Sequence, residues 1–259
     1  MTISAFFTAH GNGSDPAPRV LVWEQMLYQA MRLLDEAQRR VCSADNQKEL
    51  RKLEGWWRNK RVKVGGTECL VPSEEAISEA LWAEMENIRD EMTLRIGAFD
   101  PSMSGVDLLQ VSPESPRKVR KGIGEKSKPT DIRFYRTGSE ILDLRVEAKV
   151  VLKESDLKPY LSKDGLKRFS DEDEPYTTHE IGGMIAYALT SDKSTWINRI
   201  EGALKNEKPP LETFRQRVKT ISDETLFSRV PCKLTSTARD QVLVFHVVLE
   251  FECEPKERT

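Results

Sequence analysis

The fold is decided by residues 131–151, which read DIRFYRTGSEILDLRVEAKVV. A run with Ile, Phe and Tyr and a second run rich in Ile, Leu and Val flank a Thr-Gly-Ser turn at residues 137–139, a pattern that predicts two antiparallel strands. Glu147 and Lys149 alternate with apolar residues in the second run, so they share one face of that strand. Asp131 opens the first strand. The hairpin therefore predicts two carboxylates and one ammonium group at one end of a sheet.

Such a group has the composition needed to cut a phosphodiester bond. Carboxylates are hard oxygen ligands for Mg²⁺, and a lysine cation can act on the attacking water and the scissile phosphate. The alternative is a solvated edge hairpin whose charges form surface ion pairs of little energetic value. Glu-x-Lys alone is uninformative in a chain that is 32% charged, and a second copy at residues 254–256 contains Pro255, which argues against a strand. The strand context of the inner copy favours the catalytic interpretation.

The hairpin resembles the PD-(D/E)xK superfamily of nucleases, also called restriction-endonuclease-like. Asp131 matches the first acid of that motif, and Glu147 and Lys149 match its acid-x-Lys half. Thr130 separates Asp131 from Pro129, so the literal Pro-Asp dipeptide is absent. The resemblance covers at most residues 75–187. It implies an α/β fold with a restriction-endonuclease-like mixed β-sheet flanked by helices and preceded by a helical N-terminal extension.

The same resemblance implies a metal site on the hairpin. Asp131 and Glu147 would ligate Mg²⁺, with Mn²⁺ as a substitute, and the carbonyl group of Ala148 would complete the shell. Lys149 would orient or activate the attacking water. In this interpretation the catalytic residues are Asp131, Glu147 and Lys149.

A helix is predicted over residues 73–96, with Ser73 as its cap and two glutamates in its first turn. Glu84 falls inside the apolar stripe of this helix, where a carboxylate must be paired or bind a metal. Members of the superfamily often carry a further metal-directed glutamate on the first core helix, so Glu84 is the candidate and Glu91 the second choice. The alternative is that Glu84 reaches solvent or pairs with Arg89 or another base.

A cationic loop precedes the hairpin at residues 116–128. Its basic side chains are expected to contact phosphates and to add salt-dependent affinity for nucleic acid; they are Arg117, Lys118, Arg120, Lys121, Lys126 and Lys128. The alternative is a solubilising loop. A second basic run at residues 51–63 contains two tryptophans, which are more typical of a core than of a base-stacking surface.

The rest of the chain yields a coarse prediction of elements. Residues 1–18 are expected to be irregular, residues 21–41 and 45–59 helical, and residues 63–70 a short strand. A helix is predicted over residues 178–189, with Tyr187 as an accessory site candidate and with two glycines that allow close packing on a sheet.

Towards the C-terminus, residues 195–221 are expected to be helical on both sides of the Pro209-Pro210 pair. Residues 232–237 and 241–253 are expected to form a terminal β-hairpin, in which His246 is a hydrogen-bonded core residue. The expected domain division is a helical region of residues 1–64 packed on a nuclease-like core of residues 65–259.

Composition narrows the class of protein. The four cysteines show no Cys-x-x-Cys spacing, which makes zinc ribbons and disulfide frameworks improbable. No apolar run has the length of a membrane span, and the N-terminus lacks a secretory pattern, so a cytoplasmic location is expected. The net charge of −2 indicates that any affinity for nucleic acid is local or assisted by a partner.

The functional hypothesis is an Mg²⁺-dependent endonuclease that hydrolyses nucleic acid, with DNA preferred to RNA. Restriction, phage defence and repair are the contexts that the superfamily suggests, with a homodimer or a helicase, ATPase or sensor subunit as partner. The alternative is a catalytically silent nucleic-acid-binding or assembly subunit of the same fold. A third hypothesis is an unrelated α/β enzyme in which the hairpin is a coincidence.

Overall fold

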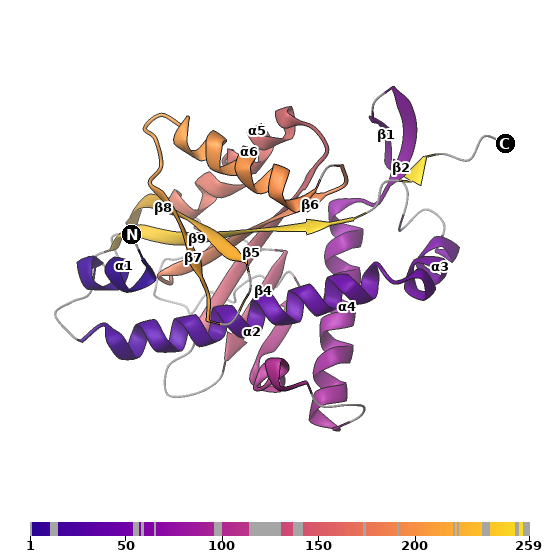
Figure 1. Cartoon of the computed structure of the whole chain (residues 1–259). Helices are drawn as coiled ribbons and strands as arrows, with labels where there is room; N and C mark the ends of the chain where they lie inside the picture. The colour runs from indigo at the N-terminus through magenta and orange to yellow at the C-terminus, as the bar shows by residue number, and fades with distance from the viewer. Residues whose placement is uncertain are drawn as a thin grey trace, which may run out of the picture.

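The computed structural model describes most of the 259-residue chain. The described residues are 2–10, 15–53, 57, 60–64, 66–95, 100–113, 131–136, 142–172, 175–190, 192–219, 221, 223–234, 239–251 and 254–255. They form a mixed α/β structure in which helices cover both faces of a central sheet (Figure 1).

The central sheet has seven strands. In spatial order they are β3 (Gln110–Pro113), β4 (Ile132–Arg136), β5 (Leu142–Val151), β6 (Ile181–Ala188), β9 (Arg239–Glu250), β8 (Glu224–Leu234) and β7 (Thr213–Arg217). The central strands β5, β6 and β9 run parallel to one another, whereas the remaining neighbours are antiparallel. The predicted hairpin of residues 131–151 is confirmed as β4 and β5.

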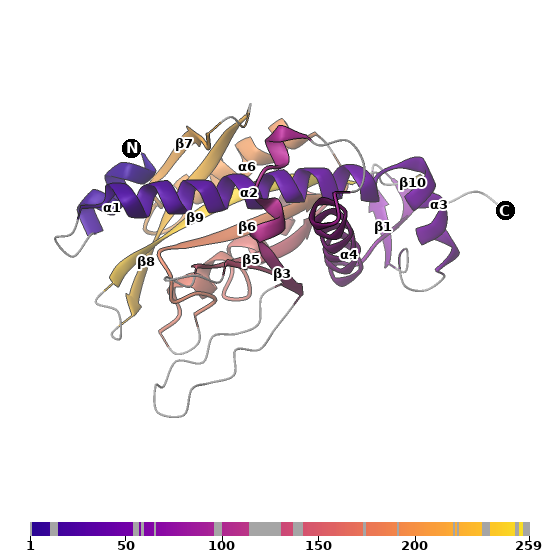
Figure 2. The ribbon, with the colours of Figure 1, turned by 90° about the horizontal axis from the view of Figure 1, so that it is seen from below.

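Two long helices lie on one face of this sheet, and shorter ones lie on the other. Figure 2 shows α2 (Ala17–Val41) running along the sheet, and Figure 1 shows α4 (Glu74–Thr93) crossing α2 steeply. The opposite face is covered by α5 (Leu157–Leu161) and α6 (Lys193–Lys205). Shorter helical elements complete the set: α1 (Ile3–His10), α3 (Ala44–Lys52), η1 (Pro101–Met103), η2 (Val106–Leu108), η3 (Glu154–Asp156) and η4 (Leu166–Ser170).

A small second sheet lies beside the start of α4. It consists of β1 (Lys60–Val64), β2 (Thr67–Val71) and the two-residue strand β10 (Glu254–Pro255), which pairs with β2. The expectation that Pro255 excludes a strand is wrong, because β10 is an edge strand, where a proline needs no ladder partner for its missing N–H. The expected domain boundary after residue 64 falls between the paired strands β1 and β2, and the division into two domains stays a prediction.

The helix predicted over residues 178–189 is wrong, because this segment forms β6. All eight residues of β6 are buried, and a strand buried on both faces has a continuous apolar sequence that does not alternate. Gly182 and Gly183 allow close packing, as predicted, but they do so within a strand, where aromatic rings pack against them. A Cβ atom at Gly182 would lie 2.2 Å from the Phe169 ring, and one at Gly183 would lie 2.3 Å from the Phe245 ring.

Two further segments also differ from the prediction. Residues 1–18 include α1, whose Ile3, Phe6 and Phe7 are buried in the main core, so tertiary contacts of these apolar side chains stabilise the helix. On the C-terminal side of the proline pair, residues 213–217 form β7 rather than a helix, because β8 pairs with them. The terminal hairpin is confirmed, although its first strand begins at Glu224.

Within the described ranges, no helix combines the length and the apolar character needed to cross a bilayer.

Candidate active site

The β4–β5 hairpin brings Asp131 beside the Glu147-Ala148-Lys149 segment. Because Ile132 pairs with Val146, Asp131 lies next to Glu147 at the point where β4 begins. Its Oδ2 atom accepts a hydrogen bond of 2.7 Å from the backbone N–H of Ala148. The structure therefore brings the three predicted catalytic side chains together at one place on the sheet.

Lys149 forms two ion pairs in this group. Its Nζ atom donates to Glu147 Oε1 at 2.8 Å and to Glu74 Oε1 at 2.8 Å. Burial alone would lower the pKa of Lys149, but the two carboxylates raise it well above the ordinary lysine value. Lys149 is therefore held as a cation between two elements of the fold.

Glu74 is the carboxylate of this site that the sequence did not reveal. It lies in the first turn of α4, which Ser73 caps by accepting a hydrogen bond from the Ala76 N–H. Besides its bond to Lys149, Glu74 accepts a 3.1 Å hydrogen bond from the Val150 N–H through Oε2. The sequence showed only a glutamate suited to the positive end of a helix. Its contact with β5 depends on how α4 docks on the sheet.

The site carries more negative charge than its lysine neutralises. Burial raises the pKa of Asp131 to about 8, and the charges of Glu147 and Glu74 act in the same direction. Burial also raises the pKa of Glu147, which Lys149 only partly opposes. Three carboxylates around one ammonium group form a place where a further cation would be stabilised.

A second cluster on the same face of β5 shows that burial alone does not cause this imbalance. Asp143 is only 1% exposed, yet its pKa is lowered, because the effects of Arg133 and Arg145 exceed that of burial. Arg133 donates to Asp143 through Nε at 2.8 Å, and Arg145 does so through Nη2 at 3.3 Å. Two guanidinium groups therefore neutralise one carboxylate here, whereas the candidate site has one ammonium group for three carboxylates.

Two tyrosines border the carboxylates from opposite faces of the sheet. Tyr176, which precedes β6, donates its hydroxyl proton to the Asp164 carbonyl oxygen at 3.3 Å, and the same hydroxyl group opposes the rise in the pKa of Glu147. Tyr187, the predicted accessory residue, is fully buried, and its hydroxyl group lies 2.9 Å from Ser78 Oγ of α4. Burial and the nearby Asp131 raise the pKa of Tyr187. Tyr176 therefore contacts the site directly, whereas Tyr187 lies behind it with its hydroxyl group occupied by Ser78.

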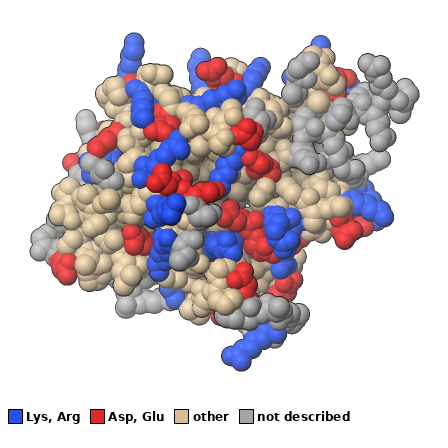
Figure 3. Space-filling view, viewed as in Figure 1, with Lys and Arg blue, Asp and Glu red and all other residues tan. Residues whose placement is uncertain are grey.

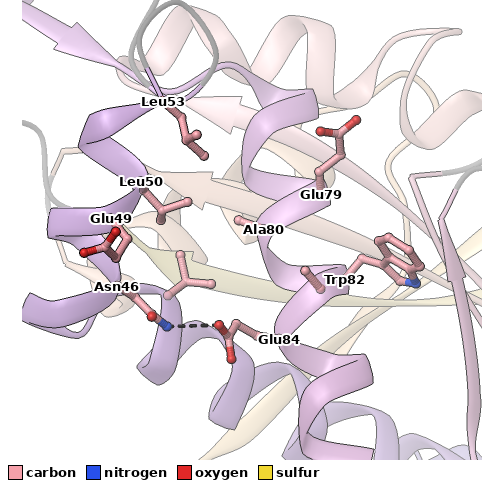
Figure 4. Close-up of a pocket in the computed structure, with 10 residues that line it drawn as sticks. Asn46, Glu49, Leu50, Leu53, Glu79, Ala80, Trp82 and Glu84 are labelled. Atoms are coloured by element: carbon pink, nitrogen blue, oxygen red, sulfur yellow. Dashed lines mark hydrogen bonds between the residues drawn. The ribbon is translucent and has the colours of Figure 1, made fainter.

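Glu84 does not lie with these residues. Ten residues of helix separate it from Glu74, a rise of about 15 Å along the axis. Figure 4 shows Glu84 facing Asn46 of α3, whose Nδ2 donates to Glu84 Oε1 at 3.0 Å. The second choice, Glu91, binds Arg40 of α2 through two hydrogen bonds of 2.8 and 2.7 Å. The acidic residue that α4 brings to the hairpin is therefore Glu74.

The predicted phosphate-binding residues Arg117, Lys118, Arg120, Lys121, Lys126 and Lys128 lie outside the described residues. In the second basic run, Trp57 is buried at 2% exposure, which fits the core role expected of tryptophan. His246 is likewise a core residue as predicted. Its ring nitrogens lie 2.9 Å from the Tyr160 hydroxyl and 2.8 Å from the Ser228 hydroxyl, and burial lowers its pKa to about 3.

The oxygen donors of the site suit Mg²⁺, but in this structure two of its carboxylates are paired with Lys149. Asp131, Glu147 and Glu74 offer carboxylate oxygens, the hard ligands that Mg²⁺ prefers. In the described part of the chain, no three His, Cys, Asp or Glu side chains are arranged to hold a metal ion. One oxygen of Glu147 and both oxygens of Glu74 are already engaged by Lys149 and the Val150 N–H. Metal binding would therefore require Glu147 to turn from Lys149 or to use its second oxygen.

No family model, curated protein or solved structure matches the chain.

Proposed function

We propose that the protein is an Mg²⁺-dependent endonuclease that hydrolyses phosphodiester bonds of nucleic acid, with DNA preferred to RNA. The observation that carries this proposal is the partly buried group of Asp131, at the start of β4, with Glu147 and Lys149 of β5 and with Glu74 as a third carboxylate. The raised pKa values of Asp131 and Glu147, caused mainly by burial, support it, because carboxyl groups with strongly shifted pKa values are typical of functional sites.

In this proposal Asp131, Glu147 and the Ala148 carbonyl group hold Mg²⁺ or Mn²⁺. When bound, the metal supplies Lewis-acid activation of the phosphate. Lys149 is held as a cation, so it orients the attacking water and offsets negative charge on the phosphate oxygens. Glu74 positions the Lys149 ammonium group from the side of α4.

We also propose that residues 74–188 have a restriction-endonuclease-like architecture. The support is the succession of α4, the antiparallel strands β3, β4 and β5, the short helix α5 and the parallel strand β6. The acidic residues of the site come from the start of α4 and from the hairpin of this unit.

A cytoplasmic role in restriction, phage defence or repair follows from the same proposal, with a homodimer or a helicase, ATPase or sensor subunit as partner. On the face shown in Figure 3, acidic and basic side chains are interspersed rather than separated. Such a surface supports local contacts with nucleic acid rather than a broad electrostatic attraction.

The second candidate function is a catalytically silent nucleic-acid-binding or assembly subunit. One observation favours it: Lys149 is already paired with Glu147 and Glu74, so the described carboxylates are arranged around a lysine rather than a metal. One measurement distinguishes the two functions: only the nuclease yields cleaved nucleic acid when a metal ion is added.

The deciding experiment incubates the purified protein with supercoiled plasmid, linear single strands and RNA in Mg²⁺, Mn²⁺ or EDTA. The test variant is Glu147→Gln, which keeps the shape of the side chain. The matched control is Glu84→Gln, which alters a half-buried glutamate that binds Asn46 instead. Metal-dependent cleavage that survives in Glu84→Gln and is lost in Glu147→Gln would establish the nuclease. Equal cleavage by both variants would refute the assignment, and binding without product would favour the silent subunit.

A further inference from the structure

A cleft of about 1130 Å³ opens beside the candidate active site. Glu74 and Lys149 line it, so the site forms part of its wall. Further lining comes from β1, from the segment that follows β5 and from α6, which are far apart in the sequence.

Apart from Lys149, the cations that line this cleft have no acidic partner among the described residues. Lys60, Lys63, Lys153 and Arg199 all line it and are all exposed. Among the described residues, no acidic side chain forms an ion pair with any of the four. Their charges are therefore available to a ligand in the cleft.

Two of the four carboxylates that line the cleft accept hydrogen bonds from the protein itself. Asp156 accepts hydrogen bonds from the backbone N–H groups of Leu152 at 2.9 Å and Lys153 at 3.1 Å. Glu74 is bound to Lys149 and to a backbone N–H. Five cations, Lys149 included, and four carboxylates line the cleft, so its described lining carries a small excess of positive charge.

Arg199 is also held in place. Its guanidinium carbon lies 4.9 Å from the centre of the Trp196 ring, and Trp196 is fully buried. A guanidinium group stacked on a fixed ring loses little conformational freedom when it binds a phosphate.

We propose that this cleft binds the sugar-phosphate backbone of the nucleic acid, with Lys60, Lys63, Lys153 and Arg199 contacting successive phosphates. Spaced cations from separate elements match a polymer of regularly spaced phosphates better than a single small anion. The position of Lys149 on the cleft wall then places one phosphate beside the candidate catalytic group. This inference deepens the proposed nuclease function and rests on it for the place of cleavage, but binding can be measured without cleavage.

The test uses the full chain in EDTA and follows the fluorescence anisotropy of labelled oligonucleotides. Probes of about 20 nucleotides exceed the single-strand site sizes of about 4–16 nucleotides. They are a DNA single strand, its duplex and an RNA of the same sequence, each measured over a salt series. The variants are Lys60→Gln/Lys63→Gln and Lys153→Gln/Arg199→Gln. The control is Lys48→Gln/Lys208→Gln, which removes two exposed lysines that do not line the cleft.

Each cleft variant is expected to bind at least about tenfold more weakly than the control. The slope of affinity against salt concentration should fall by about one for each phosphate that the variant no longer binds. The probe whose affinity falls most identifies the strand form that the cleft accepts. Affinities equal to those of the control, or no measurable binding of any probe by the unaltered protein, would overturn the proposal. All the altered residues are exposed, so unchanged circular dichroism is expected to confirm that the variants fold.

The two proposals fail separately. Cleavage by the unaltered protein together with unaffected binding by the cleft variants would overturn the cleft and leave the nuclease intact. Weakened binding by the cleft variants, in a protein that yields no product with Mg²⁺, would uphold the cleft and overturn the nuclease.

Discussion

The Nζ atom of Lys149 lies 2.8 Å from Glu74 Oε1, although the two residues are 75 positions apart in the chain. This ion pair ties the first turn of α4 to the strand that carries the candidate catalytic group. The start of the helix is therefore part of the site, and a substitution of Glu74 should change the position of the Lys149 ammonium group.

Replacing Glu74 by Gln is expected to lower metal-dependent cleavage by about 10–100-fold, the usual cost of losing a group that orients an active residue. The effect should fall on kcat more than on KM, because Glu74 positions Lys149 and does not bind substrate broadly. Steady-state cleavage of a labelled substrate checks this, with Glu84→Gln on the same helix as the control. Equal kcat values for the two variants would show that Glu74 has no positioning role.

Replacing Glu147 by Gln is expected to reduce cleavage by at least about a thousandfold, since the metal's stabilisation of the transition state is worth several kcal/mol. Affinity for nucleic acid in EDTA should stay the same or increase, because the variant removes a negative charge beside the cleft. Isothermal calorimetry with Mg²⁺ is expected to show weaker metal binding. Undiminished cleavage would remove Glu147 from the mechanism.

The stability of the metal-free protein is expected to depend on the ionisation of Asp131. Its pKa in the folded protein is about 8, raised from an ordinary value of 3.8, so the folded state holds a proton that the unfolded state has lost. The contribution of Asp131 to the free energy of unfolding is complete below pH 3.8. It falls as the pH rises to about 8, with a slope of at most about 1.4 kcal/mol per pH unit.

Urea unfolding in EDTA at several pH values tests this dependence. Asp131→Asn keeps an oxygen acceptor for the Ala148 N–H and removes the titrating group. The difference in unfolding free energy between this variant and the unaltered protein should therefore grow with pH in favour of the variant. Added Mg²⁺ should stabilise the unaltered protein more at pH 8 than at pH 6, because deprotonated Asp131 binds the metal. A pH-independent difference would contradict the raised pKa of Asp131.

Replacing Tyr176 by Phe removes a hydroxyl group that donates to the Asp164 carbonyl oxygen and that also lowers the pKa of Glu147. Because this hydroxyl group lowers the pKa of Glu147, its loss is expected to shift the acidic limb of the pH–rate profile towards higher pH. A drop in kcat of about tenfold at neutral pH should be largely recovered at higher pH. A uniform loss at all pH values would indicate a packing role instead.

The glycines of β6 allow a test of packing that is independent of function. Gly183→Ala places a Cβ atom 2.3 Å from the Phe245 ring, so unfolding free energy should fall by about 1–3 kcal/mol from overpacking. Gly202→Ala is the matched control, since it lies in α6 with no atom within 4 Å of the added Cβ. That substitution should stabilise the protein by about 0.4–1 kcal/mol. Denaturant midpoints for the two variants measure both effects.

Local patterns in the sequence identified the elements whose residues alternate or recur with a clear period. The β4–β5 hairpin and the α2 helix are such elements, and the Ser73 cap marks the start of α4. The meeting of Asp131, Glu147 and Lys149 could also be predicted, because a short hairpin brings its own strands together without help from the rest of the chain.

Other elements could not be predicted, because their conformation depends on distant partners. The sequence of β6 resembles a helix, and its two glycines suit a strand only because Phe169 and Phe245 pack on them from elsewhere in the fold. β7 is a strand because β8 pairs with it, and α1 is a helix with its apolar side chains in the main core.

The sequence by itself determined the chemistry of the hairpin, an acidic pair and a lysine on two paired strands. Only the tertiary structure decided that Glu74 rather than Glu84 completes the group. The helical period predicts that both residues lie on α4, but it does not predict which turn of α4 contacts β5. The cleft was decided in the same way. Lys60, Lys153 and Arg199 belong to three separate elements, and only the packing of those elements on the sheet brings their charges to one place.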